Sequence, residues 1–94
     1  MKVKTLRDGH DGRRAYAAGD VIPDSEHARA LLASGLADPA DDAAEKAAAD
    51  PDFIKRHFRA AYAVQVTQQE LTPARADRLK LVAAELAAAI KKEA

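Results

Sequence analysis

The sequence predicts a helix-dominated α+β fold, with a small ββ(β)α module at residues 1–38 and an α-helical hairpin at residues 51–94. Short alternating segments separated by glycine turns fill the first 22 residues, and capped apolar repeats at helical spacing follow. Alanine makes up 24 of the 94 residues, and it favours helix because it loses no side-chain entropy there. Only 21 larger apolar side chains remain, so we expect a thin core.

The first segment predicts strands. Residues 2–6 alternate polar and apolar side chains, which is the pattern of a half-buried strand. Residues 8–12 are rich in Asp and Gly, so we expect a hairpin turn there and a second strand at residues 13–17. A turn at Gly19 leads into a third short extended piece at residues 21–22. Strands this short are stable only if another element covers their face.

A helix that covers these strands is expected next. It begins after Pro23, with either Asp24 or Ser25 accepting hydrogen bonds from its free backbone amides. It ends at Gly35, which we expect in the left-handed conformation of a helix C-terminus, and residues 36–37 add a last β-bridge. The apolar face of this helix consists of Ala28, Leu31 and Leu32.

The middle and the C-terminal half differ in what they can bury. Residues 39–50 are acidic and contain no apolar side chain larger than alanine apart from proline. They form either a linker with partial helicity, which we favour, or a solvated helix. Two better helices follow, and each begins with an N-cap residue and a proline, Asp50-Pro51 and Thr72-Pro73.

The last helix carries two apolar strips. Its seam recurs at the three- and four-residue spacing of a packed helix and consists of Leu79, Val82, Ala83, Leu86, Ala89 and Ile90. Leu81 lies nearly opposite that seam. A second strip on a helix with one neighbour indicates contact with another chain.

The charges cancel over the chain but not along it. Lys and Arg number 15, and Asp and Glu also number 15, so no overall field favours nucleic acid or a membrane. The balance is +2 over residues 1–22, −6 over residues 23–52 and +4 over residues 53–94. Such segregation suits head-to-tail contacts between copies. No apolar run is long enough to span a membrane and no signal-peptide core follows Met1, so we expect a soluble protein that is cytosolic at synthesis.

Nothing in the sequence indicates catalysis. Without cysteine, the chain has no disulfide, thiolate metal site or cysteine nucleophile. His10, His27 and His57 form no ligand pair four residues apart, and a metal site needs at least three convergent donors. Ser25 and Ser34 have no visible base. We therefore expect no enzyme, no catalytic residue, no metal and no cofactor.

A basic cluster gives the main alternative to a purely structural protein. Lys55, Arg56 and Arg59 follow one side of the first long helix, and Arg75 and Arg78 follow the next. Two adjacent cationic faces could hold phosphates, although we favour a charged solvated face. Tyr62 is displaced from the apolar stripe of its helix, so it is either a rim residue or an interface residue.

The N-terminal module resembles a known family. The matching features are the initial Lys2-Val3-Lys4, the stretch Tyr16-Ala17-Ala18-Gly19-Asp20-Val21-Ile22, and the helix end Leu31-Leu32-Ala33-Ser34-Gly35-Leu36-Ala37. Residues 1–38 resemble the FluMu-type N-terminal domain of Mu-like prophages, which is encoded among head-morphogenesis genes. The resemblance implies a protein of a tailed phage head region, present in the virion and, during assembly, in the host cytoplasm.

The sequence therefore leaves three expected functions. The leading expectation is a structural virion protein that decorates the capsid or joins head to tail by adhesion, as a homo-oligomer or in a symmetric array with other phage proteins. Its expected interface residues are Tyr62, Leu81, Arg56 and Arg59. The alternative is a nucleic-acid-binding assembly factor that uses Lys55, Arg56, Arg59, Arg75 and Arg78. The third is a host-takeover protein that binds one bacterial partner.

Overall fold

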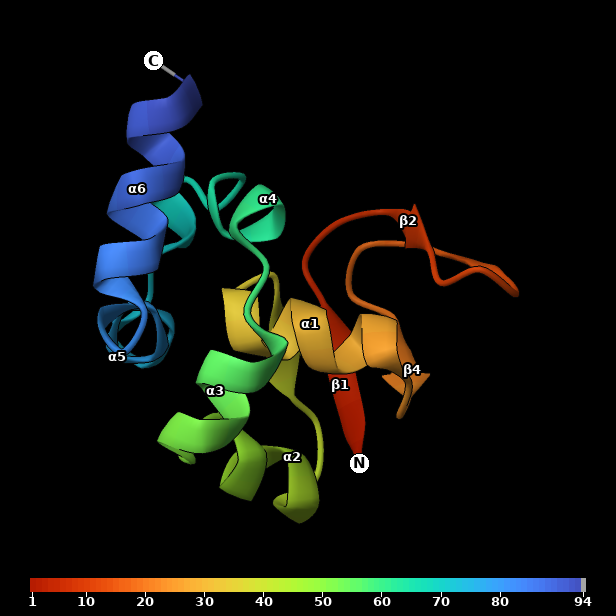
Figure 1. Ribbon diagram of the computed structural model, residues 1–94. Coiled ribbons are helices and arrows are strands. Elements are labelled where there is room, and N and C mark those ends of the chain that lie inside the picture. Colours follow the sequence, from red (N-terminus) through yellow and green to blue (C-terminus); the bar gives the residue numbers. More distant parts are fainter. Residues whose placement is uncertain (94) are drawn as a thin grey trace.

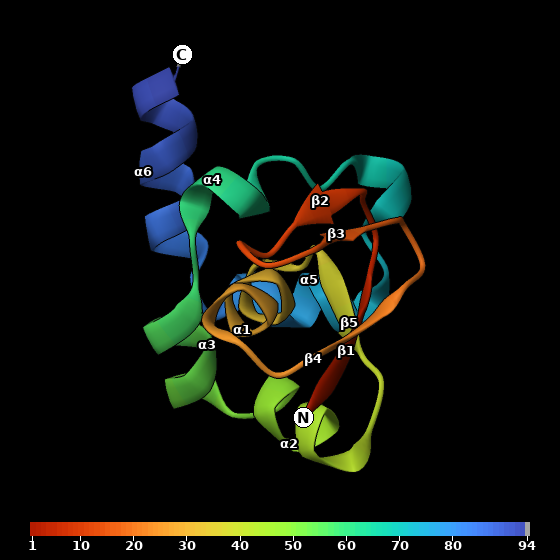
Figure 2. The same ribbon diagram turned by 90° about the vertical axis from the view of Figure 1, so that its right-hand side faces the viewer.

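A three-stranded antiparallel sheet forms one side of the molecule (Figures 1 and 2). The computed structural model describes residues 1–93, apart from the side chains of Ala89, Lys92 and Glu93, so that part of the expected seam lies outside the described side chains. β1 (Lys2–Thr5) is the central strand, between β4 (Val21–Pro23) and β5 (Ala37–Pro39). The expected alternation is confirmed, because Val3 and Thr5 are buried and their neighbours Lys2 and Lys4 are exposed.

The strand pairing differs from the predicted hairpin. β2 (Gly9–His10) and β3 (Ala15–Tyr16) pair with each other in a separate ribbon, whereas β1 pairs with β4 and β5. The ribbon turns tightly because the Asp11 carboxylate accepts the backbone amides of Arg13 and Arg14. The expectation that residues 13–17 pair with the first strand is therefore wrong, since that role falls to residues 21–23.

Helix α1 (Glu26–Ser34) lies across the sheet, and its two ends follow the sequence prediction. Ser25 is the N-cap and accepts the Ala28 amide at 3.0 Å. Gly35 ends the helix with φ 86°, and the Leu36 amide then donates back to the Leu31 carbonyl at 3.0 Å. The α+β class and the dominance of helix are confirmed.

Residues 39–50 contain a helix instead of the linker that we favoured. α2 (Asp42–Ala48) begins at Asp41, whose carboxylate accepts the Ala44 amide at 2.8 Å. Ala44 is completely buried and packs with the apolar core of the sheet and α1. Because alanine is small, this helix can approach the sheet closely. It therefore packs on the core without a larger apolar side chain.

The C-terminal half consists of short helices instead of one long hairpin. They are α3 (Pro51–His57), α4 (Ala60–Ala63), the 3₁₀ helix η1 (Gln68–Glu70), α5 (Pro73–Lys80) and α6 (Ala83–Glu93). The first expected helix breaks at Arg59, because its amide donates to the buried Ser34 hydroxyl at 2.9 Å instead of to a helical carbonyl. The second bends after Leu81, where Leu81 and Val82 bond only three residues back.

Helix α1 lies between two apolar clusters. On one side are the strands and α2, and on the other are α3, α4 and the start of the terminal helices (Figures 1 and 2). The second cluster consists of Ala33, Ile54, Ala63, Leu79 and Val82. A single helix therefore supports both halves of the chain.

Candidate protein-interaction surface

An apolar row that starts at Val82, the residue before α6 (Ala83–Glu93), becomes exposed towards the C-terminal end of that helix. Val82, Leu86 and Ile90 lie four residues apart and therefore share one face. Their exposure rises along the helix: Val82 is 1% exposed, Leu86 is half-buried against the second cluster, and Ile90 is 54% exposed. The helix continues past the folded body, as Figures 1 and 2 show. We name Val82, Leu86 and Ile90 the α6 stripe.

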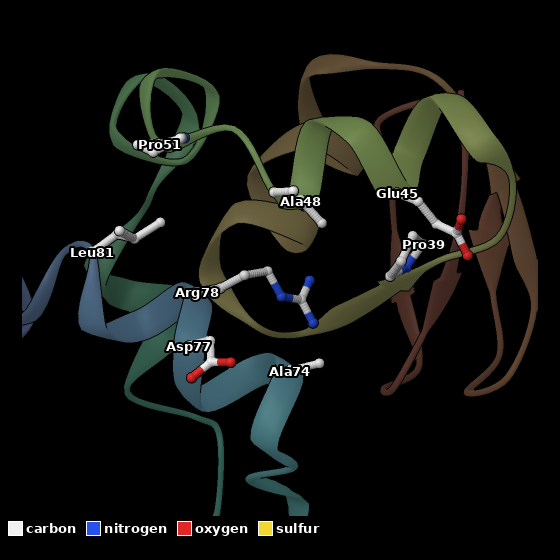
Figure 3. Close-up of a pocket in the computed structure, with 9 residues that line it drawn as sticks. Pro39, Glu45, Ala48, Pro51, Ala74, Asp77, Arg78 and Leu81 are labelled. Carbon is white, nitrogen blue, oxygen red and sulfur yellow. The ribbon is translucent and has the colours of Figure 1, made fainter.

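A groove of about 480 Å³ opens where α2, α3 and α5 meet (Figure 3). Most of its lining is apolar and small: Pro39, Ala48, Ala49, Pro51, Ala74 and Leu81. Glu45 and Asp77 add negative charge, and Arg78 forms part of the wall. Leu81, one of the expected interface residues, lies at this groove and is 38% exposed. We name this feature the Leu81 groove.

Arg78 fixes one wall of the Leu81 groove. Its side chain is 4% exposed, and its guanidinium donates to the carbonyls of Leu32 and Ala37 at 2.8 and 2.9 Å. It also pairs with Asp38 at 3.2 Å. Arg75 donates two hydrogen bonds to the same carboxylate, at 2.9 and 2.6 Å. This wall of the groove is thus held by an ion-pair network whose arginines are buried and whose shared carboxylate, Asp38, is partly exposed.

The network also sets the charge state of its members. Hydrogen bonding from Arg75 lowers the pKa of Asp38, against the opposing effect of its partial burial. Burial lowers the pKa of Arg78, and the Asp38 carboxylate counteracts that effect. With these charges matched, the described part of the chain contains no buried side-chain nitrogen or oxygen without a hydrogen-bond partner.

The expectation that Arg75 and Arg78 lie on an outer cationic face is wrong. Both side chains are buried and point into the molecule, since Asp38 and backbone carbonyls give them partners there. Lys55, Arg56 and Arg59 are exposed. Arg56 and Arg59 border one pocket of about 270 Å³, so these two expected interface residues do lie together.

Tyr62 lines a second pocket, of about 340 Å³, together with Arg59, and it belongs to a cluster that sequence reasoning missed. The Tyr16 hydroxyl is hydrogen bonded to Nε2 of His27 at 2.6 Å, and the Tyr62 hydroxyl lies 3.5 Å from Nδ1. Burial lowers the pKa of His27 and raises that of Tyr16. The three rings join β3, α1 and α4, so Tyr62 is half-buried in a contact within the chain. No sequence spacing indicates this cluster, because its members come from three separate elements.

Other kinds of site find little support. In the described residues, no three His, Asp or Glu side chains gather in a way that could hold a metal ion. None of the helices within residues 1–93 has the length and apolarity that a bilayer crossing requires. No family model, curated protein or solved structure matches the chain.

Proposed function

We propose that this chain is a small structural protein of a tailed-phage particle that acts by adhesion to other protein subunits, as a capsid decoration or at the head–tail junction. The observation that carries adhesion is the α6 stripe: Ile90 is 54% exposed, and it belongs to a helix that projects past the folded body in Figure 1. The phage assignment rests on the resemblance of residues 1–38 to the FluMu-type N-terminal domain.

The energetics favour a chain that is held between partners. Complete burial of an isoleucine side chain contributes about 1.5–3 kcal/mol relative to its exposed state. The core is small, with two clusters built largely from alanine and a few larger residues. A partner that covers the α6 stripe would stabilise the folded chain by mass action.

The nucleic-acid alternative loses two of its five cations. Arg75 and Arg78 are committed to Asp38, which leaves Lys55, Arg56 and Arg59 to meet phosphates. Binding of duplex DNA is tested at about 50 mM salt, where phosphate contacts are strongest. A shift with wild type that Arg56→Ala plus Arg59→Ala abolishes would favour an assembly factor over the adhesive role.

The experiment that tests the particle assignment is quantitative mass spectrometry of purified phage particles from a host that carries this gene. The proposal predicts that the chain is a stoichiometric component. A copy number equal to that of the major capsid protein indicates decoration, and the copy number of a single ring indicates the junction. Particles that assemble fully and contain none of the chain would contradict the proposal.

A further inference from the structure

The Leu81 groove and the α6 stripe are complementary, and we propose that the Leu81 groove of one copy binds the C-terminal end of α6 of a second copy. The inference rests on the proposed adhesive function and names its first partner. Six of the nine groove residues are apolar, and the stripe ends in an exposed isoleucine. Contact between the two surfaces would therefore remove apolar area of both from water, which is favourable.

Charge supports this pairing. Glu45 lies on the α2 side of the Leu81 groove (Figure 3). Asp77 lies on the α5 side, where its exposed carboxylate is 3.7 Å from Lys80 of the same helix. Towards the end of α6, Ile90 is followed by Lys91, whose side chain is exposed. The last turn of a helix also carries the negative end of its dipole, which a lysine there offsets. An isoleucine beside an exposed lysine suits an apolar groove with carboxylates at its edge.

The helix that follows Leu81 leaves the groove of its own chain. α6 packs against α4 and α5, and its end projects past the body in Figures 1 and 2. The pairing is therefore intermolecular. It joins two different surfaces of the same chain, the heterologous contact that builds rings or linear arrays, or a dimer when two copies exchange helices reciprocally.

Two pairs of exposed residues provide matched variants. Leu81 and Leu71 are both 38% exposed, but only Leu81 lines the groove. Ile90 and Val21 are both 54% exposed, but Val21 lies on β4. Leu81→Gln and Ile90→Gln are the test variants, and Leu71→Gln and Val21→Thr are their controls. Because none of these side chains is buried, circular dichroism should show all four variants folded.

Sedimentation velocity over a concentration series measures association of the full chain. Wild type and both controls should associate. Leu81→Gln and Ile90→Gln should each raise the dissociation constant about tenfold or more, because each removes one apolar side of the contact. An equimolar mixture of these two variants should associate again, since it pairs the intact groove of one with the intact helix tip of the other.

The chain has no cysteine, so single cysteines report the contact directly. Ala49→Cys, at the groove, mixed with Ile90→Cys should yield a disulfide-linked heterodimer under mild oxidation, faster than Ala49→Cys with Val21→Cys. A monomeric wild type would overturn the self-contact. A mixture of Leu81→Gln and Ile90→Gln that stays dissociated would also overturn it, because an intact groove and an intact helix tip would then fail to bind each other. Leu81→Gln that associates as wild type does would overturn it too, since that result indicates helix tips packing on each other.

The two proposals fail in different ways. A monomeric chain that still copurifies with phage particles would overturn the self-contact and leave the adhesive particle protein standing. A chain that self-associates through the Leu81 groove but is absent from particles would overturn the particle assignment alone.

Discussion

Nη1 of Arg78 donates to the carbonyl oxygen of Leu32 at 2.8 Å, although 46 positions separate the two residues. The contact joins α5 to the last turn of α1, where helix carbonyls lack intrahelical partners. The same guanidinium reaches Ala37 and Asp38 on β5. One side chain thus fixes a terminal helix to both α1 and the sheet.

Replacement of Arg78 should therefore destabilise the whole fold. Arg78→Met keeps an apolar stem of similar length but leaves two buried carbonyls without their charged donor, so we expect a loss of about 3 kcal/mol. Urea unfolding followed by circular dichroism measures it. Arg56→Met changes an exposed cation and should alter stability by no more than about 0.5 kcal/mol. Equal effects of the two variants would contradict the role of Arg78.

Asp38 should give the fold an acid-sensitive element. Its folded-state pKa lies below 3.8, the value expected in the unfolded chain, so its contribution is present above pH 3.8 and is lost as pH falls through the folded pKa. Asp38→Asn should cost about 2 kcal/mol near neutral pH. The difference in free energy of unfolding between wild type and Asp38→Asn should disappear at the lowest pH values. A difference that is constant down to that range would contradict the prediction.

Ser34 should determine where the first C-terminal helix breaks. Its buried hydroxyl accepts the Arg59 amide at 2.9 Å, so Ser34→Ala should cost about 1 kcal/mol and reduce hydrogen-exchange protection at the Arg59 amide. Ser25→Ala removes an N-cap of similar worth at the other end of α1. In that control, hydrogen-exchange protection at the Arg59 amide should fall by no more than the loss of global stability explains. Unchanged protection in Ser34→Ala would contradict the assignment.

His27 should titrate below the ordinary histidine range. Burial lowers its pKa from 6.5, so the folded state binds its proton less readily than the unfolded chain. The stability of the fold that depends on a neutral His27 is fully present above pH 6.5 and is lost as pH falls through the folded-state pKa. Ring resonances followed by NMR should give a midpoint below 6.5, and His27→Gln should reduce the stability change between about pH 5 and pH 6.5. His57 shifts in the same direction through burial, so part of the change should remain. A His27 midpoint at or above 6.5 would contradict the prediction.

Local signals made much of the fold predictable. The left-handed Gly35 and the prolines that start α3 and α5 depend only on nearby residues, and the structure places each as expected. Of the two expected caps of α1, Asp24 and Ser25, the structure has Ser25. The pairing of β1 was not predictable in this way. Its partners, β4 and β5, lie before and after α1 in the sequence. The Asp- and Gly-rich turn does form a local hairpin, but that hairpin joins β2 to β3 and does not include β1.

The candidate surface was predictable only in part. Leu81 stood out as a surplus apolar residue, and it is 38% exposed. Ile90 was expected in the packed seam of the last helix, but it is 54% exposed because the helix extends past the elements that cover its first turns. The groove beside Leu81 gave no signal, because its walls are alanines and prolines from a segment that read as a linker. Arg75 and Arg78 are spaced like a solvated face, and only the fold brings Asp38 and two carbonyls to them.

The amount of Ile90→Gln in purified phage particles, relative to wild type and Val21→Thr, tests the central claim most directly. Ile90 and Val21 are equally exposed, so a loss specific to Ile90→Gln reports the α6 stripe and not general surface chemistry. We predict that wild type and Val21→Thr copurify with particles in the same amount and that Ile90→Gln is depleted about tenfold. Full incorporation of Ile90→Gln would contradict adhesion through α6, and absence of all three proteins would contradict a particle role.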